Sequence, residues 1–160
     1  MAIDDVKALA MTPPLLTVAV AESLTSGHLQ ALIGSVSGAS GFFLGGVTAY
    51  TLGQKVSLLG VDRSVAEPVN CVSAPVAEQM ARGVCELFGS AIGVATTGYA
   101  EPAAPGASPH AYWCIVSRGG PVLRSGKIEA PGLSRTEVQR TVAGRVGDAL
   151  VDAVRAIRAS

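Results

Sequence analysis

The sequence is poor in charge and in aromatic residues. Only 15% of its 160 residues are charged, whereas a globular domain usually carries about a quarter. Twelve Lys and Arg balance twelve Asp and Glu, so the chain lacks the positive field with which proteins attract nucleic acids or anionic membranes. We therefore expect neither nucleic acid nor a membrane as a partner. Aromatic residues make up 4% of the chain, so Ala, Val, Leu and Ile must supply most of the core.

The chain has too few cysteines and histidines for most metal sites and for most histidine-dependent catalytic sites. The three cysteines form no CxxC pair, and His28 and His110 are the only histidines, which leaves little room for a histidine triad or a zinc site. GxGxxG, P-loop, HExxH, GxSxG and SxxK motifs are absent. We expect no metal and no cofactor. An odd number of cysteines without a signal-peptide pattern favours a cytoplasmic protein.

One segment carries no charge at all. Residues 23–54, 32 positions between Glu22 and Lys55, contain no Asp, Glu, Lys or Arg. A membrane span needs about 20 predominantly apolar residues, but serines, glycines and other polar residues interrupt every apolar run here well before that length. The composition therefore argues against a membrane span, and something other than lipid keeps this segment neutral.

Strand and helix patterns alternate along the chain. Short apolar runs predict strands, and apolar residues repeating every three to four positions predict helices. The predicted strands cover 15–20, 42–50, 91–97, 111–117 and 122–130. The predicted helices begin at the caps Thr25 or Ser26, Thr51, Ser73 and Ser134. This order indicates one α/β domain over 1–160 with its core at about 15–158, a three-layer α/β/α sandwich with a mixed β-sheet.

Scarce histidine points to lysine as the base of any serine-dependent chemistry. A lysine that burial keeps neutral can take a serine proton. Lys55 follows a predicted strand by one short turn, and Ser23 occupies the same position after the first strand. Tyr50 and Thr97 also end strands, where α/β sheets bind ligands. From spacing alone, helix capping explains Ser23 better, and a solvated Lys55 is an equal alternative.

An ordered set of short motifs resembles the C-terminal domain family of CinA, the competence and damage-inducible protein. Residues 21–27, AESLTSG, resemble the family motif AESxTxG. Further pieces follow in family order, namely Gly38–Gly41, Phe43–Val47 with Tyr50 and Lys55, Leu59–Val61, Val72–Ser73, and Thr97–Gly98 with Ala100 and Pro102. The resemblance covers roughly residues 15–158 and implies the same α/β/α fold. The family includes nicotinamide mononucleotide deamidases.

The resemblance implies an amidohydrolase of pyridine nucleotide salvage. Such an enzyme converts nicotinamide mononucleotide into nicotinate mononucleotide and ammonia without a cofactor. By motif position, Ser23 is expected as the nucleophile, Lys55 as its base, and Tyr50 as a residue that relays the proton or holds the lysine. The resemblance assigns substrate binding to Thr25, Ser26, Gly27, Ser40, Thr97 and Gly98.

Several segments depart from the family pattern. Tyr99 and Glu101 stand where a TGIAGP motif has smaller neutral residues, Pro109–Trp113 replaces a PVGTVY stretch, and the SNEAK segment is reduced to residues 51–55. Glu101 would repel a phosphate-bearing substrate unless it points away or pairs with an arginine. The departures favour an alternative function, a catalytically altered or inactive CinA-like protein that binds a nucleotide or regulates another process.

The sequence leaves three further points open. The N–H groups that follow Ser23 are expected to hold either an oxyanion or a phosphate. Arg135 and Arg140 are candidates for phosphate binding because both lie at the start of the last predicted helix. Whether the chain forms a homo-oligomer is also left open. Direct action on DNA follows only from the family's name, and zero net charge disfavours it.

Overall fold

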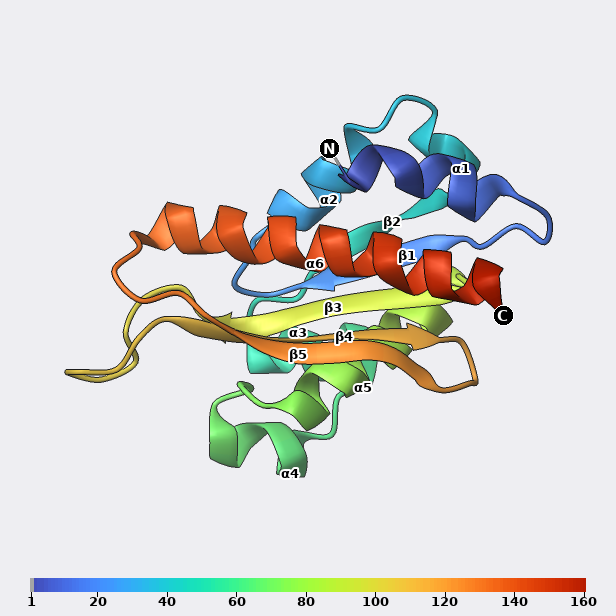
Figure 1. Cartoon of the computed structure of the whole chain (residues 1–160). Coiled ribbons are helices and arrows are strands. Elements are labelled where there is room, and N and C mark those ends of the chain that lie inside the picture. The colour runs from blue at the N-terminus through green and yellow to red at the C-terminus, as the bar shows by residue number, and fades with distance from the viewer. Residues whose placement is uncertain (1) are drawn as a thin grey trace.

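A mixed five-stranded sheet forms the centre of the computed structural model, which describes residues 2–160 (Figure 1). The strands are β1 (Val18–Glu22), β2 (Phe43–Thr48), β3 (Ile92–Tyr99), β4 (His110–Ser117) and β5 (Val122–Glu129). They lie in the order β2-β1-β3-β4-β5. β1 runs parallel to both of its neighbours, whereas β4 is antiparallel to β3 and to β5. The prediction of a mixed sheet is confirmed.

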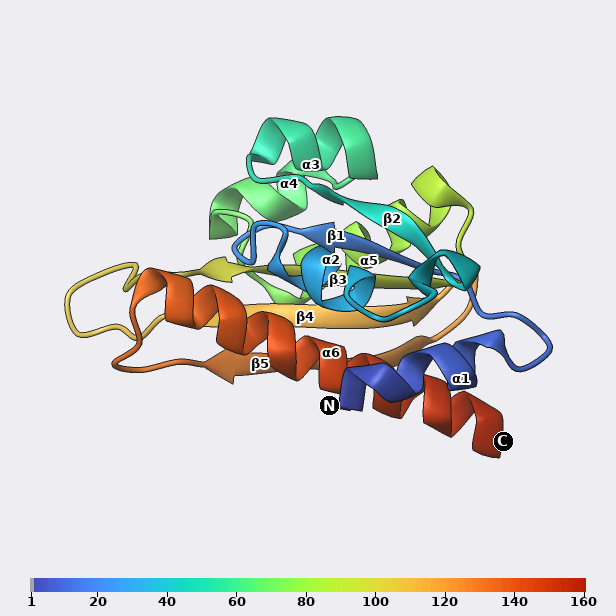
Figure 2. The ribbon, with the colours of Figure 1, turned by 90° about the horizontal axis from the view of Figure 1, so that it is seen from above.

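Helices cover both faces of this sheet (Figures 1 and 2). One face carries α1 (Val6–Met11), α2 (His28–Gly34) and α6 (Arg135–Ala159), and the other carries α3 (Leu52–Leu59), α4 (Arg63–Ala66) and α5 (Ala74–Phe88). Short 3-10 helices occupy Ala2–Asp5, Ala39–Gly41 and Glu67–Val69. The three-layer α/β/α architecture is therefore confirmed. None of the helices within residues 2–160 is long and apolar enough to cross a membrane.

Side-chain alternation along β1 explains why both faces are covered. Val18 and Val20 are fully buried in the cluster that includes α6, and Ala19 and Ala21 are fully buried in the cluster that includes α5. A strand buried on both faces needs apolar residues at every position. The α5 face carries the smaller residues because that helix packs close to the sheet: a Cβ on Gly93 would lie 2.1 Å from the Ala81 carbonyl oxygen.

Three of the four predicted helix N-caps are confirmed. The side chains of Thr51 and Ser73 accept hydrogen bonds from the first turns of α3 and α5. Ser134 and Glu137 form the capping box that was predicted for α6. These bonds satisfy N–H groups that a helix start leaves without intrahelical partners.

Four strand boundaries differ from the prediction by two residues or more, and one of them is the end of β1, which lies at Glu22 rather than at residue 20. β1 begins at Val18 rather than at residue 15, because the Leu16 N–H bonds to the Ala10 carbonyl at the end of α1 and Leu15 is exposed. β2 ends at Thr48, so Tyr50 lies in the following loop. β3 extends two residues further than predicted, to Tyr99, because it pairs with β4 up to His110.

Candidate active site

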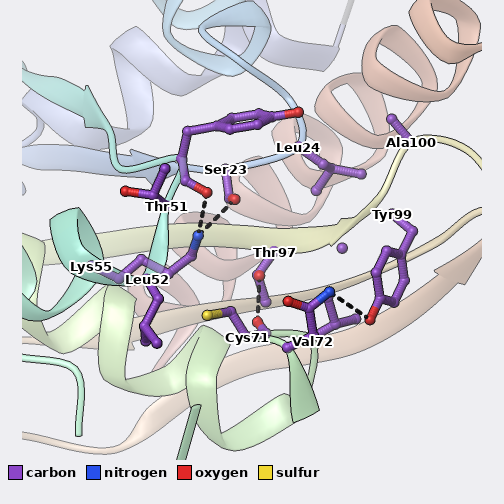
Figure 3. Close-up of a pocket in the computed structure, with 13 residues that line it drawn as sticks. Ser23, Leu24, Thr51, Leu52, Lys55, Cys71, Val72, Thr97, Tyr99 and Ala100 are labelled. Carbon is purple, nitrogen blue, oxygen red and sulfur yellow. Dashed lines mark hydrogen bonds between the residues drawn. The ribbon is translucent and has the colours of Figure 1, made fainter. Parts of the chain in front are cut away.

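A pocket opens where the carboxyl ends of the parallel strands meet (Figure 3). Its volume is about 220 Å³, below the roughly 300–1,000 Å³ that encloses a drug-sized ligand. The pocket therefore accommodates the reacting end of a ligand and leaves the remainder at its mouth. The lining comes from the segments after β1 and β2, from the loop before α5 and from the end of β3: Ser23, Leu24, Tyr50, Thr51, Leu52, Lys55, Asn70, Cys71, Val72, Thr97, Gly98, Tyr99 and Ala100.

Ser23 and Lys55, 32 residues apart in the chain, meet in this pocket. The Lys55 ammonium nitrogen Nζ lies 2.9 Å from Ser23 Oγ, and Figure 3 shows the Lys55 side chain reaching toward Ser23. Ser23 is 6% exposed and Lys55 is 2% exposed. This contact is the geometry that a serine nucleophile and its base require.

The surroundings of Lys55 favour its neutral form. Burial lowers the pKa of the ammonium below its ordinary value, and the nearby Cys71 opposes that shift to a smaller extent. No carboxylate among the described residues forms an ion pair with Lys55. A lysine with a lowered pKa holds a free lone pair at a lower pH, and only that form accepts a proton.

Tyr50 contacts Lys55 through its backbone rather than its ring. The Tyr50 carbonyl oxygen accepts a hydrogen bond of 2.9 Å from Lys55 Nζ, while the phenol accepts one from the Arg135 guanidinium. Tyr50 is 48% exposed. The Tyr50 carbonyl, and not its phenol, therefore holds the Lys55 side chain in place. A proton relay through the phenol does not follow from this geometry.

Glu22, a residue that the sequence analysis did not assign to the site, fixes the turn that carries Ser23. Its carboxylate is fully buried and accepts hydrogen bonds of 2.9 Å from the N–H groups of Leu29 and Gln30, in the first turn of α2. The prediction that Thr25 or Ser26 caps this helix is therefore wrong. The sequence signal for this role of Glu22 was its position as a single charged residue at the end of an apolar strand.

The other hydroxyls of the AESLTSG segment do not line the pocket. Thr25 is fully buried and shares a hydrogen bond of 2.8 Å with the Thr96 hydroxyl. Ser26 is exposed with φ of 47°, and Gly27 has φ of 93°, a left-handed conformation that suits glycine. The structure thus places these three residues in the turn that supports Ser23, not on the predicted substrate surface.

Ser40 lies away from the pocket. It is exposed in the 3-10 helix Ala39–Gly41, which precedes β2. The pocket forms at the carboxyl ends of the parallel strands, so Ser40 lies at the opposite end of β2. Ser40 is therefore not part of the lining of this pocket, and its contact with substrate stays a prediction.

Thr97 and Gly98 do line the pocket, but each also has a structural task. The Thr97 hydroxyl donates a hydrogen bond of 2.6 Å to the Cys71 carbonyl and so fixes the loop before α5. Asn70 and Cys71 in that loop both have positive φ. A Cβ on Gly98 would lie 2.3 Å from the His110 carbonyl oxygen, so glycine permits the close approach of β4. The sequence analysis missed this loop because it has no helix or strand pattern.

Two of the residues that depart from the family pattern, Tyr99 and Glu101, lie in or next to the pocket lining. Tyr99 packs edge-on against His110, with ring centroids 5.4 Å apart, and its phenol accepts a hydrogen bond from Asn70. Glu101 pairs with the Arg135 guanidinium at 3.2 Å. The sequence analysis named pairing with an arginine as one way for Glu101 to avoid repelling a phosphate, and the structure contains such a pair.

The fold and this geometry define an α/β/α protein with a buried serine–lysine pair at the carboxyl edge of its parallel strands. Residues 5–153 match the CinA C-terminal domain. The chain belongs to the CinA C-terminal domain family.

Individual relatives agree with this assignment. The chain is 41% identical over 131 residues to a CinA-like protein of Chlorobium limicola. The match covers 78% of this chain and 30% of that protein. It thus spans less than a third of this curated relative. Two crystal structures match 96% of both chains: a CinA superfamily protein from Klebsiella pneumoniae, with a TM-score of 0.86 and 21% identity, and a competence/damage-inducible protein from Agrobacterium tumefaciens, with a TM-score of 0.82 and 25% identity.

Proposed function

We propose that this protein is an amidohydrolase that converts nicotinamide mononucleotide into nicotinate mononucleotide and ammonia. One observation carries the proposal: a buried lysine with a lowered pKa lies 2.9 Å from a serine hydroxyl inside a pocket. A serine needs an adjacent base to attack a carboxamide. Membership of the CinA C-terminal domain family supports this substrate, because the family that the motifs of this chain resemble includes nicotinamide mononucleotide deamidases.

The reaction proceeds in two halves. Ser23 Oγ forms a bond to the carboxamide carbon while Lys55 Nζ takes the hydroxyl proton. As the C–N bond breaks, Lys55 returns this proton to the nitrogen, and ammonia leaves an ester on Ser23. Lys55 then takes a proton from water as the oxygen of that water attacks the ester. The serine oxygen recovers that proton as the carboxylic acid product departs, and the acid then releases its own proton to the solvent to become the carboxylate.

The oxyanion of each intermediate needs a hydrogen-bond donor close to Ser23. The N–H groups of Leu29 and Gln30 already bond to Glu22, and the Ser26 N–H bonds to the Ser23 carbonyl. We assign the oxyanion to the N–H of Leu24, which directly follows the nucleophile and lines the pocket. One such donor typically contributes about 10²–10³ in kcat.

A second candidate function is nucleotide binding without turnover. The residues around the pocket support it, because Tyr99 lines the pocket and the Glu101–Arg135 pair adjoins the lining residues Tyr50 and Ala100. Binding of a pyridine nucleotide in a calorimeter without ammonia release would favour this function over the first.

The direct test of the amidohydrolase is product formation in ¹⁸O-labelled water. Nicotinamide mononucleotide should give equimolar ammonia and nicotinate mononucleotide, with one ¹⁸O atom in the new carboxylate by mass spectrometry. Nicotinate mononucleotide, which has no carboxamide, serves as the control and should release no ammonia. Absence of ammonia from the carboxamide substrate would contradict the proposed function.

The rate should depend on pH through Lys55. Its pKa is lowered by burial, and the neutral amine is the active base. We therefore expect kcat/KM to fall as pH drops through that lowered pKa and to level off above it. Between the lowered pKa and the ordinary lysine value the unfolded chain binds more protons than the folded one, so the free energy of unfolding should rise with pH there. A kcat/KM that does not fall on the acid side, over the whole pH range in which the protein stays folded, would contradict the role of Lys55 as a base.

A further inference from the structure

The pocket offers almost no positive charge to an anionic ligand. Lys55 is the only cationic side chain in its lining, and it is buried and occupied by Ser23 and the Tyr50 carbonyl. A phosphate group bound at this site therefore needs a counter-charge from outside the lining.

Two of the three positions that the sequence suggested for phosphate binding are not available to a phosphate at this pocket. The N–H groups at the start of α2 already bind an anion, the Glu22 carboxylate. Arg140 lines a different groove, between α2 and α6, together with His28 and Leu32. Among the three sequence-suggested positions, this leaves Arg135.

The Arg135 guanidinium is fixed beside the pocket mouth by two partners. Its Nη2 donates to the phenol of Tyr50 and its Nη1 lies 3.2 Å from Glu101 Oε2. Tyr50 and Ala100, the residue before Glu101, both line the pocket. A pocket of about 220 Å³ holds the reacting end of a mononucleotide, so the phosphate would lie at this mouth. A phosphate and the Glu101 carboxylate would then compete for one guanidinium.

We propose that Glu101 is a specificity-determining residue that occupies Arg135 and so lowers the preference of this site for a phosphate-bearing carboxamide over its neutral nucleoside. The inference rests on the proposed function, because it concerns the substrate of the same pocket. A carboxylate at this position repels a phosphate and neutralises the arginine that would attract it. The side chains of Glu101 and Arg135 are 65% and 45% exposed, so solvent screening limits the effect.

The test compares nicotinamide mononucleotide with its nucleoside, which lacks only the phosphate. Glu101→Gln should raise the ratio of kcat/KM between mononucleotide and nucleoside by about three- to tenfold, mainly through a lower KM for the mononucleotide. The increase should shrink in 0.5 M salt. In an Arg135→Gln background, Glu101→Gln should raise the ratio by less, because only the direct repulsion between the carboxylate and the phosphate is then removed.

Glu86→Gln is the matched control. Glu86 also pairs with an arginine, Arg118, at 3.3 Å, and its side chain is 68% exposed, but it does not line this pocket. The control should not change the ratio. An increase of equal size in the Glu86 variant, or no increase in the Glu101 variant, would overturn the proposal.

Calorimetric binding of the two compounds separates this inference from the proposed function. Tighter mononucleotide binding by Glu101→Gln without any ammonia release supports the role of Glu101 and contradicts the amidohydrolase. Turnover with an unchanged ratio supports the amidohydrolase and contradicts the role of Glu101. Binding of neither compound to either protein contradicts both.

Discussion

Replacing Lys55 with methionine should lower kcat/KM for nicotinamide mononucleotide by about 10³-fold or more. General-base catalysis alone contributes about 10²–10⁴, and the nucleophile cannot act without it. Ser23→Ala should have an effect of similar size. The double variant should be no slower than either single variant, because residues that act in one step are not additive. Steady-state ammonia release measures all three.

Stability measurements separate this catalytic loss from misfolding. Lys55 is 2% exposed, and removing an amine whose charged form is penalised by burial should maintain or raise the midpoint of thermal unfolding. Lys127→Met is the matched control: Lys127 lies on β5, pairs with Glu129 and has a side chain that is 42% exposed. It should retain wild-type activity. Equal losses in the Lys55 and Lys127 variants would contradict the catalytic assignment.

Glu22→Gln should lower the free energy of unfolding by about 2–4 kcal/mol. The buried carboxylate accepts from the N–H groups of Leu29 and Gln30, and hydrogen bonds to a charged group contribute about 1.5–3 kcal/mol each. An amide retains one acceptor oxygen, but its NH₂ group faces the second N–H, so one buried donor is left unpaired. Urea denaturation measures the change. Because Glu22 also fixes the turn before α2, kcat should fall more than KM rises.

A second carboxylate at a helix start provides the comparison. Glu137 accepts a hydrogen bond from the Ser134 N–H at the start of α6, and it is exposed. Glu137→Gln should lower the free energy of unfolding by only about 0.5–1 kcal/mol, with no effect on turnover. Equal destabilisation by the two substitutions would show that burial does not strengthen the Glu22 contacts.

The elements that could be predicted are those with local signals. Thr51, Ser73 and Ser134 cap their helices as predicted, because a cap and the N–H group that it binds lie within three residues. Strand ends were less predictable. β1 begins late because Leu16 bonds to α1, and β3 extends to Tyr99 because β4 is beside it. Both differences arise from contacts between segments that are distant in sequence.

The candidate site likewise has parts that could be predicted from the sequence and parts that could not. Ser23 and Lys55 could be predicted because each follows a strand, and parallel strands that are neighbours bring their carboxyl ends together. The direction of the Tyr50 ring could not be predicted, since its phenol bonds to Arg135, 85 positions away. The Glu101–Arg135 pair spans 34 positions and joins a loop to a helix start, with no shared local pattern.

The sequence by itself determined the α/β/α layers and three of the helix caps, because apolar periodicity and capping act over a few residues. It also singled out Ser23, which begins the uncharged segment, and Lys55, which follows it. Only the tertiary structure decided how the polar groups pair. It assigned Glu22 to the α2 N-terminus, the Tyr50 carbonyl to Lys55, and Glu101 to Arg135. Each of these pairings depends on distances between segments that meet only when the sheet has formed, and such distances leave no local trace in the chain.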